Sequence, residues 1–113
     1  MAKVSIKGEG DINQISRVLI NGVQASGLSC ELIDSSERTL GQNKVILLVF
    51  EKYYMRSSNR ASLTCMLSQS EDTIYVDAVG SGGGQGALFK FSWGSEENFV
   101  SIVPSILSEH GFS

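Results

Sequence analysis

The chain contains little proline, cysteine or histidine. Its 113 residues include one proline, two cysteines and one histidine. No Cys-x-x-Cys pair occurs, which excludes a zinc ribbon or a thioredoxin-type redox site. Cys30 and Cys65 each lie among apolar residues of an expected strand, so we expect two buried, reduced thiols. We therefore predict neither a metal site nor a cofactor.

Long apolar runs are also absent. The longest run, residues 45–50, is far shorter than the roughly 20 residues that a membrane-spanning helix needs. The chain begins Met-Ala-Lys-Val-Ser-Ile-Lys, without the apolar stretch or cleavage pattern of a signal peptide. These features predict a soluble, cytoplasmic protein without membrane contact.

The chain lacks an excess of basic charge. Nine basic and twelve acidic residues give a formal net charge of −3. Binding to nucleic-acid phosphates needs clustered lysine and arginine, so a nucleic-acid partner is not expected. The balance of 42% apolar and 19% charged residues is typical of a folded globular protein. We expect residues 1–113 to form a single domain.

The first part of the chain alternates and then becomes helical. Residues 2–8 alternate between apolar and polar, as a half-buried strand does. Asp11 is suited to the N-cap of a helix, and Gln14 completes a capping box. Apolar residues then recur at helical spacing until Gly27, a typical helix stop. The pattern predicts a helix over residues 11–26.

Four stretches in the middle of the chain have the pattern of strands. Short turn-like segments separate them, and no crossover helix fits between them, which indicates an antiparallel meander. The stretch 44–56 is the strongest, and its first half is apolar on both faces, as in a central strand that is covered on each side. The expected strands are 28–38, 44–56, 61–68 and 73–79, with a loop over 39–43.

The last part contains a glycine-rich segment and a second helix. Five glycines lie within residues 80–86, and residues 87–93 are expected to form a further strand. A helix is expected to begin at Ser95 and to end at Gly111, with a kink at Pro104 because proline removes one backbone hydrogen bond.

These elements predict an α+β fold in the order β-α-β-β-β-β-(β)-α. Two amphipathic helices need a sheet face to cover, so we expect a two-layer sandwich. Its sheet is mostly antiparallel, with five to six strands, and both helices lie on one face. The other face would carry Tyr53 or Tyr54, Met66 and Tyr75. An apolar face without cover is a candidate surface for a dimer or a ligand.

The glycine segment is one candidate ligand site. Residues 82–87 match the pattern G-x-G-x-x-A after an expected strand, and backbone N–H groups in such a segment are able to cradle an anion. The residues that follow look like a strand rather than the helix that a dinucleotide-binding loop requires, and no Walker lysine is present. A plain connection with special backbone angles is the alternative. The candidate ligand-binding residues are Gly82, Gly83, Gly84 and Gln85.

The hairpin tip between the second and third strands of the meander is the other candidate. Arg56 and Arg60 flank the turn, where their guanidinium groups are placed to converge on a carboxylate or phosphate. Tyr53 offers a ring for stacking. The alternative is a solvated hairpin tip whose charges pair across the strands.

Signals of catalysis are weak. No G-x-S-x-G motif occurs, and the one histidine, His110, lies where a cation interacts favourably with the end of the last helix. Asp77 lies inside an expected strand. If its face of the sheet is covered, Asp77 needs a partner such as Lys90 or Arg60. The sequence leaves enzymatic activity open but favours a non-catalytic protein.

Three segments carry a resemblance to a known family. These are Phe50-Glu51-Lys52-Tyr53, Asn59-Arg60-Ala61-Ser62-Leu63, and Ser81-Gly82-Gly83-Gly84-Gln85 leading into Phe89-Lys90. Together they resemble a small, uncharacterised bacterial family of about this length, a domain of unknown function. The resemblance implies a bacterial, cytoplasmic protein with one compact domain, and it implies no activity or cofactor.

Two functional hypotheses follow. The leading one is a non-catalytic module that binds a ligand or a protein, with a second copy of the chain or a small anionic ligand as partner. The alternative is an anion- or nucleotide-binding protein, or a small enzyme, that uses the segment Gly82–Gly86 with Arg56 and Arg60.

Overall fold

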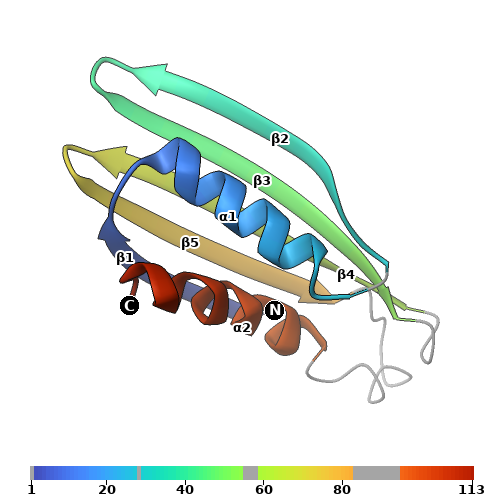
Figure 1. Ribbon diagram of the computed structural model, residues 1–113. Coiled ribbons are helices and arrows are strands. Elements are labelled where there is room, and N and C mark those ends of the chain that lie inside the picture. Colours follow the sequence, from blue (N-terminus) through green and yellow to red (C-terminus); the bar gives the residue numbers. More distant parts are fainter. Residues whose placement is uncertain (1, 28, 55–58, 83–94) are drawn as a thin grey trace.

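A computed structural model describes residues 2–27, 29–54, 59–82 and 95–113. Over these residues the chain forms the predicted α+β fold, with five strands and two α-helices (Figure 1). The expected further strand over 87–93 lies outside the described residues. The elements are β1 (Ala2–Glu9), α1 (Ile12–Gln24), β2 (Cys30–Leu40), β3 (Asn43–Tyr54), β4 (Asn59–Ser70), β5 (Thr73–Gly82), α2 (Ser95–Leu107) and a short 3₁₀ helix (Ser108–His110).

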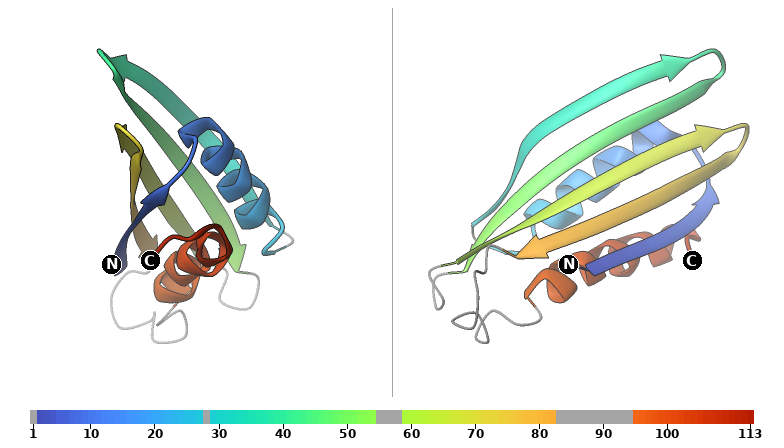
Figure 2. Two further views of the ribbon diagram at one scale, coloured as in Figure 1. Left: turned by 60° about the vertical axis from the view of Figure 1, so that its left-hand side comes forward. Right: turned by 180° about the vertical axis from the view of Figure 1, so that it is seen from behind.

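The strands form one sheet in the order β1-β5-β4-β3-β2, and every neighbouring pair is antiparallel. The meander from β2 to β5 is the predicted one, and β1 joins it at the edge beside β5. The central strand is β4 rather than β3. The expectation that β3 is covered on both faces is also wrong for the described residues, because both helices lie on the same side of the sheet (Figure 2).

The core lies between the helices and this covered face. Alternate residues of the three inner strands point into it, and the apolar stripes of both helices pack against them. The largest of the side chains that are less than 2% exposed are Phe50, Leu48, Leu63, Leu67, Ile74 and Val76 from the sheet, with Leu19, Val23, Phe99, Val103 and Leu107 from the helices.

Side chains fix the start of α1 to the sheet. Asp11 caps the helix as predicted, accepting a hydrogen bond from the Asn13 N–H at 3.0 Å. The amide of Gln69 in β4 accepts from the Ile12 N–H at 3.2 Å and donates to the Gly10 carbonyl at 2.8 Å. The helix ends at Gln24, two residues before the predicted end. The Ala25 N–H still bonds to the Asn21 carbonyl as in a helix, but the Ser26 N–H bonds to the Val23 carbonyl, only three residues back.

Strand β2 extends further than predicted. Residues 39 and 40, expected in a loop, pair with β3, and the connection is the tight turn Gly41-Gln42. Gly41 has φ +63°, a left-handed angle that favours glycine in such hairpins. A β-bulge interrupts the pairing between Leu32 and Asp34.

The segment after α2 closes the edge of the sheet beside β1. The helix contains Pro104 and gives way to the 3₁₀ helix before Gly111, which has φ +84°. Phe112 is 3% exposed, and a Cβ added at Gly8 would lie 2.7 Å from its ring. Ser113 and Lys7 exchange two backbone hydrogen bonds of 3.1 Å.

We predict that Gly8→Ala lowers the free energy of unfolding by about 1–3 kcal/mol, because the rigid Phe112 ring occupies the space that a methyl group needs. Urea denaturation followed by circular dichroism measures the change. Gly27→Ala is the matched control, since the added Cβ would meet the movable end of the Lys52 side chain. Equal losses for the two variants would contradict the proposed role of Phe112.

Candidate functional site

The predicted hairpin site is only partly described. Tyr53 and Arg60 are partners across β3 and β4, and the Arg60 guanidinium carbon lies 5.7 Å from the centre of the Tyr53 ring. Arg60 Nη1 also donates to Glu51 Oε1 at 2.7 Å. Arg56 lies outside the described residues. The described part therefore matches the expected pairing of charges across the strands.

The strand that leads into the glycine segment ends beside this hairpin. Gly82, at the end of β5, pairs with Ala61, the residue after Arg60. The other glycine-segment candidates, Gly83, Gly84 and Gln85, lie outside the described residues.

A surface hollow of about 370 Å³ lies next to Arg60. Besides Tyr53 and Arg60, it is lined by two carboxylates, Glu31 and Glu51, which are direct partners across β2 and β3. Within the described residues the hollow thus combines one guanidinium with two acidic groups, which does not favour an anion. The anion site stays a prediction that depends on Arg56 and on residues 83–85.

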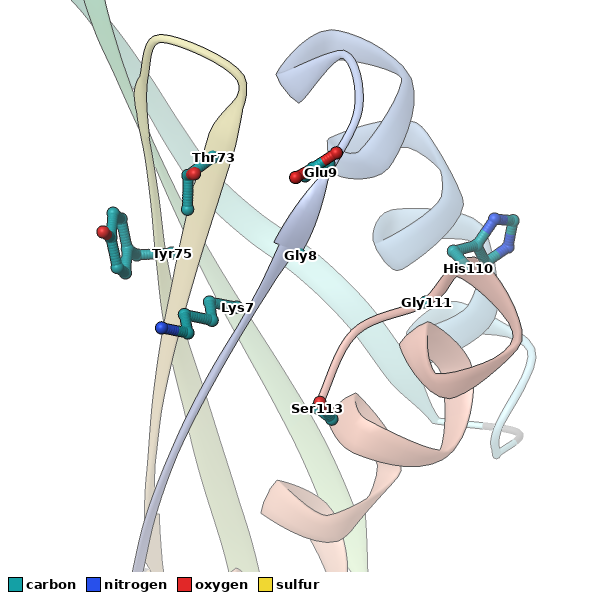
Figure 3. Close-up of a pocket in the computed structure, with 8 residues that line it drawn as sticks. All are labelled: Lys7, Gly8, Glu9, Thr73, Tyr75, His110, Gly111 and Ser113. Atoms are coloured by element: carbon teal, nitrogen blue, oxygen red, sulfur yellow. The ribbon is translucent and has the colours of Figure 1, made fainter.

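A larger hollow of about 560 Å³ lies at the β1 edge (Figure 3). Figure 3 shows Lys7 and Tyr75 on one side of β1 and His110 on the other, so these groups do not converge on one point. His110 lies in the 3₁₀ helix that follows α2, close to its predicted position. The hollow is lined by Lys7, Gly8, Glu9, Thr73, Tyr75, His110, Gly111 and Ser113.

The partner of Asp77 is a hydroxyl group. Ser5 Oγ donates to Asp77 Oδ1 at 2.6 Å, from the position directly opposite on β1. Arg60, one of the two partners expected from the sequence, binds Glu51 instead, and Lys90 lies outside the described residues. The sequence did not reveal the Ser5 contact because it depends on β1 pairing with β5, two strands that are distant in the chain.

Both cysteines are free and buried, as predicted. Burial raises the pKa of the Cys65 thiol to about 12. Burial also raises the pKa of Cys30, although the charge of Lys52 and a hydrogen bond with Ser26 partly offset that effect. Among the described residues, no group of three or more histidine, cysteine or acidic side chains is placed to hold a metal ion.

The most prominent exposed feature is the sheet face that neither helix covers, which we call the open face (Figure 2). Three large apolar side chains lie near its centre: Leu47 is 37% exposed, Met66 41% and Tyr75 45%. The half-buried side chains of Val45, Val49 and Val79 surround them. The sequence predicted Met66 and Tyr75 on this face, together with Tyr53 or Tyr54, and the strand register places Tyr53 there. It did not predict Val45, Leu47 and Val49 of β3 on this face, because this side of the strand was expected to be covered.

A protein-family model described as "Family of unknown function (DUF6054)" matches residues 1–111 of the chain. The chain belongs to this family. Membership confirms the resemblance to a small domain of unknown function. A comparison with curated proteins found no match. None of the described helices is long and apolar enough to cross a membrane.

We predict a difference in reactivity between two variants that each keep one cysteine. In the folded Cys30→Ser variant, Cys65 should react with a thiol reagent at pH 8 at least about tenfold more slowly than Cys30 does in the folded Cys65→Ser variant. Cys65 is completely buried and its pKa is raised to about 12, so little reactive thiolate is exposed. The absorbance released from an aromatic disulfide reagent measures both reaction rates. Unfolding in guanidinium chloride exposes both thiols and should abolish the difference between the rates. Equal rates in the folded state would contradict the burial of Cys65.

Proposed function

We propose that this member of the family is a non-catalytic protein-interaction module whose open face binds a second copy of the same chain. The observation that carries the proposal is the cluster of Leu47, Met66 and Tyr75, exposed at the centre of a sheet that the described residues cover on one side only. Burying such side chains is favourable by about 25 cal/mol per Å² of apolar surface. A protein surface that packs against this face and buries its apolar side chains is therefore bound favourably.

The size of the open face agrees with a reversible dimer. Five strands about 4.8 Å wide, with about 30 Å of each strand in the face, offer roughly 700 Å² per copy. Two copies would bury about 1,400 Å² in total, near the lower end of the range for stable protein interfaces. The expected dimer is therefore concentration-dependent rather than permanent.

The two edges of the sheet are less suited to binding another strand. At β1, the backbone N–H and carbonyl of Lys7 already form hydrogen bonds with Ser113. At β2, the bulge after Leu32 interrupts the edge, and exposed charges follow it at Asp34, Glu37 and Arg38. Bulges and charges on edge strands oppose pairing with another sheet. These features favour the open face over the edges as the surface that a second copy covers.

A protein-sized partner also suits the open face better than a small ligand does. The exposed apolar side chains project from three neighbouring strands, β3, β4 and β5, so they form a broad surface. Small-molecule sites are usually concave and enclose most of the ligand. A second sheet with the same alternation of side chains has a matching shape, as in sheet-on-sheet packing.

We predict that the wild-type chain forms a dimer at micromolar concentrations and that Leu47→Glu and Met66→Glu each shift it to monomer. Each change places a charge at the centre of the open face, where dimer formation would bury it without a partner. Sedimentation equilibrium measures the mass, and circular dichroism verifies the fold. Because both side chains are exposed in the single chain, we expect folding to survive.

The matched control is Asn21→Glu, which adds the same charge at an exposed position on α1, away from the open face. It should leave the dimer unchanged. A wild-type chain that stays monomeric throughout the micromolar range would overturn the proposal, as would a dimer that both open-face variants retain.

A further inference from the structure

One acidic side chain lies beside the centre of the open face. Asp77 of β5 is half-buried and is directly opposite Met66 in the central strand β4. Because side chains alternate along a strand, Tyr75 and Val79 flank Asp77 on the same face. The apolar cluster that carries the proposed interface therefore surrounds a carboxylate on three sides.

Within the described residues, the Asp77 carboxylate accepts a single hydrogen bond, from Ser5 Oγ at 2.6 Å. Its basic neighbours are Lys3 and Lys7, which lie diagonally across from it on β1. Neither lysine forms an ion pair with Asp77 in the described part of the chain. On the other side of Asp77, the same row of β4 and β3 is apolar. A carboxylate has lone pairs for further donors, and in the single chain these remain open to solvent.

Two symmetric arrangements stack the open faces of two copies, and the register shows what each places opposite Asp77. A twofold axis along β4 exchanges β5 with β3, so Asp77 faces Leu47 of the other copy. An axis across the strands, along the row of Asp77, places β5 over β5 and Asp77 over Asp77. Charges at the sheet edges do not choose between the two, because each arrangement brings together one pair of opposite charges and one pair of like charges.

The two arrangements have the same consequence for Asp77. Its facing strand is β3 in one and β5 in the other, and within the described residues neither strand presents a basic side chain on the open face. A displacement along the strands therefore brings no positive charge over the carboxylate. In both arrangements, dimer formation removes solvent from Asp77 and supplies no charged partner.

The loss of solvent around this charge opposes self-association. Burying an ionised carboxylate without a partner costs much more free energy than burying a neutral amide of the same shape. The hydrogen bond from Ser5 offsets part of that cost, because a hydroxyl group stabilises the charged form. A twofold interface contains the same carboxylate twice, so each dimer bears the cost twice.

Resting on the proposed function, we infer that the charge of Asp77 limits the affinity of the dimer and keeps self-association reversible. Leu47, Met66 and Tyr75 supply the favourable apolar contact, and the carboxylate beside them opposes it. Ser5 acts in the opposite sense to the charge, because its hydroxyl group is the donor that the buried carboxylate retains. This pair of residues sets the dissociation constant in either orientation of the two sheets.

The test removes the charge and keeps the shape of the side chain. Asp77→Asn retains an oxygen acceptor for Ser5 and should lower the dissociation constant of the dimer about tenfold or more, because the amide is neutral. Sedimentation equilibrium measures the constant, and circular dichroism verifies the fold. Glu109→Gln is the matched control, since it changes the net charge equally at an exposed position of the 3₁₀ helix. It should leave the constant within about twofold of the wild type.

A second variant should act in the opposite direction. Ser5→Ala removes the donor to the buried carboxylate and should raise the dissociation constant about threefold or more. In the Asp77→Asn background the same change should have a smaller effect, because a hydrogen bond to a neutral amide is weaker than one to a charged group. Equal effects in the two backgrounds would show that Ser5 acts on β1 in general rather than through the charge.

The outcomes separate this inference from the proposed function. If Leu47→Glu and Met66→Glu give monomers but Asp77→Asn leaves the dissociation constant unchanged, the open face is the interface and the carboxylate does not limit it. A weaker dimer of Asp77→Asn would overturn the inference, because the carboxylate would then have a donor on the other copy. If the wild type and Asp77→Asn are both monomeric throughout the micromolar range, both proposals fail. A tighter dimer of Asp77→Asn, with Glu109→Gln neutral, supports the inference.

Discussion

The packing of two helices against one face of an antiparallel sheet is the constraint on which the rest of this structure depends. The helices also contact each other closely, and a Cβ added at Gly22 of α1 would lie 2.6 Å from Ile106 of α2. Phe112 fills the notch at Gly8 in the same way at the β1 edge. All large buried side chains belong to this one layer, so its packing sets the stability of the described domain.

One-sided cover has a direct consequence for function. Alternation along a strand sends half of its side chains to each face, so a strand that is apolar throughout must present apolar groups on the face that the helices leave open. In β3 the side chains of Ile46, Leu48 and Phe50 are buried, while those of Val45, Leu47 and Val49 lie on the open face. This exposed apolar surface is what the proposed second copy would cover.

Several polar groups of the sheet are paired within the chain. Arg60 binds Glu51 and lies over Tyr53, Ser5 binds Asp77, and Gln69 joins β4 to the start of α1.

The sequence by itself determined the helices, the strands and the class of fold, because each depends on periodicity and capping within a short stretch of chain. Asp11 caps α1, and Met66 and Tyr75 lie on the uncovered face, as the local patterns predicted. Only the tertiary structure decided that β4 is central, that one apolar face of β3 stays open and that Asp77 binds Ser5. These features depend on pairing between distant strands and on the side to which the helices pack, and neither leaves a signal in the local pattern of residues.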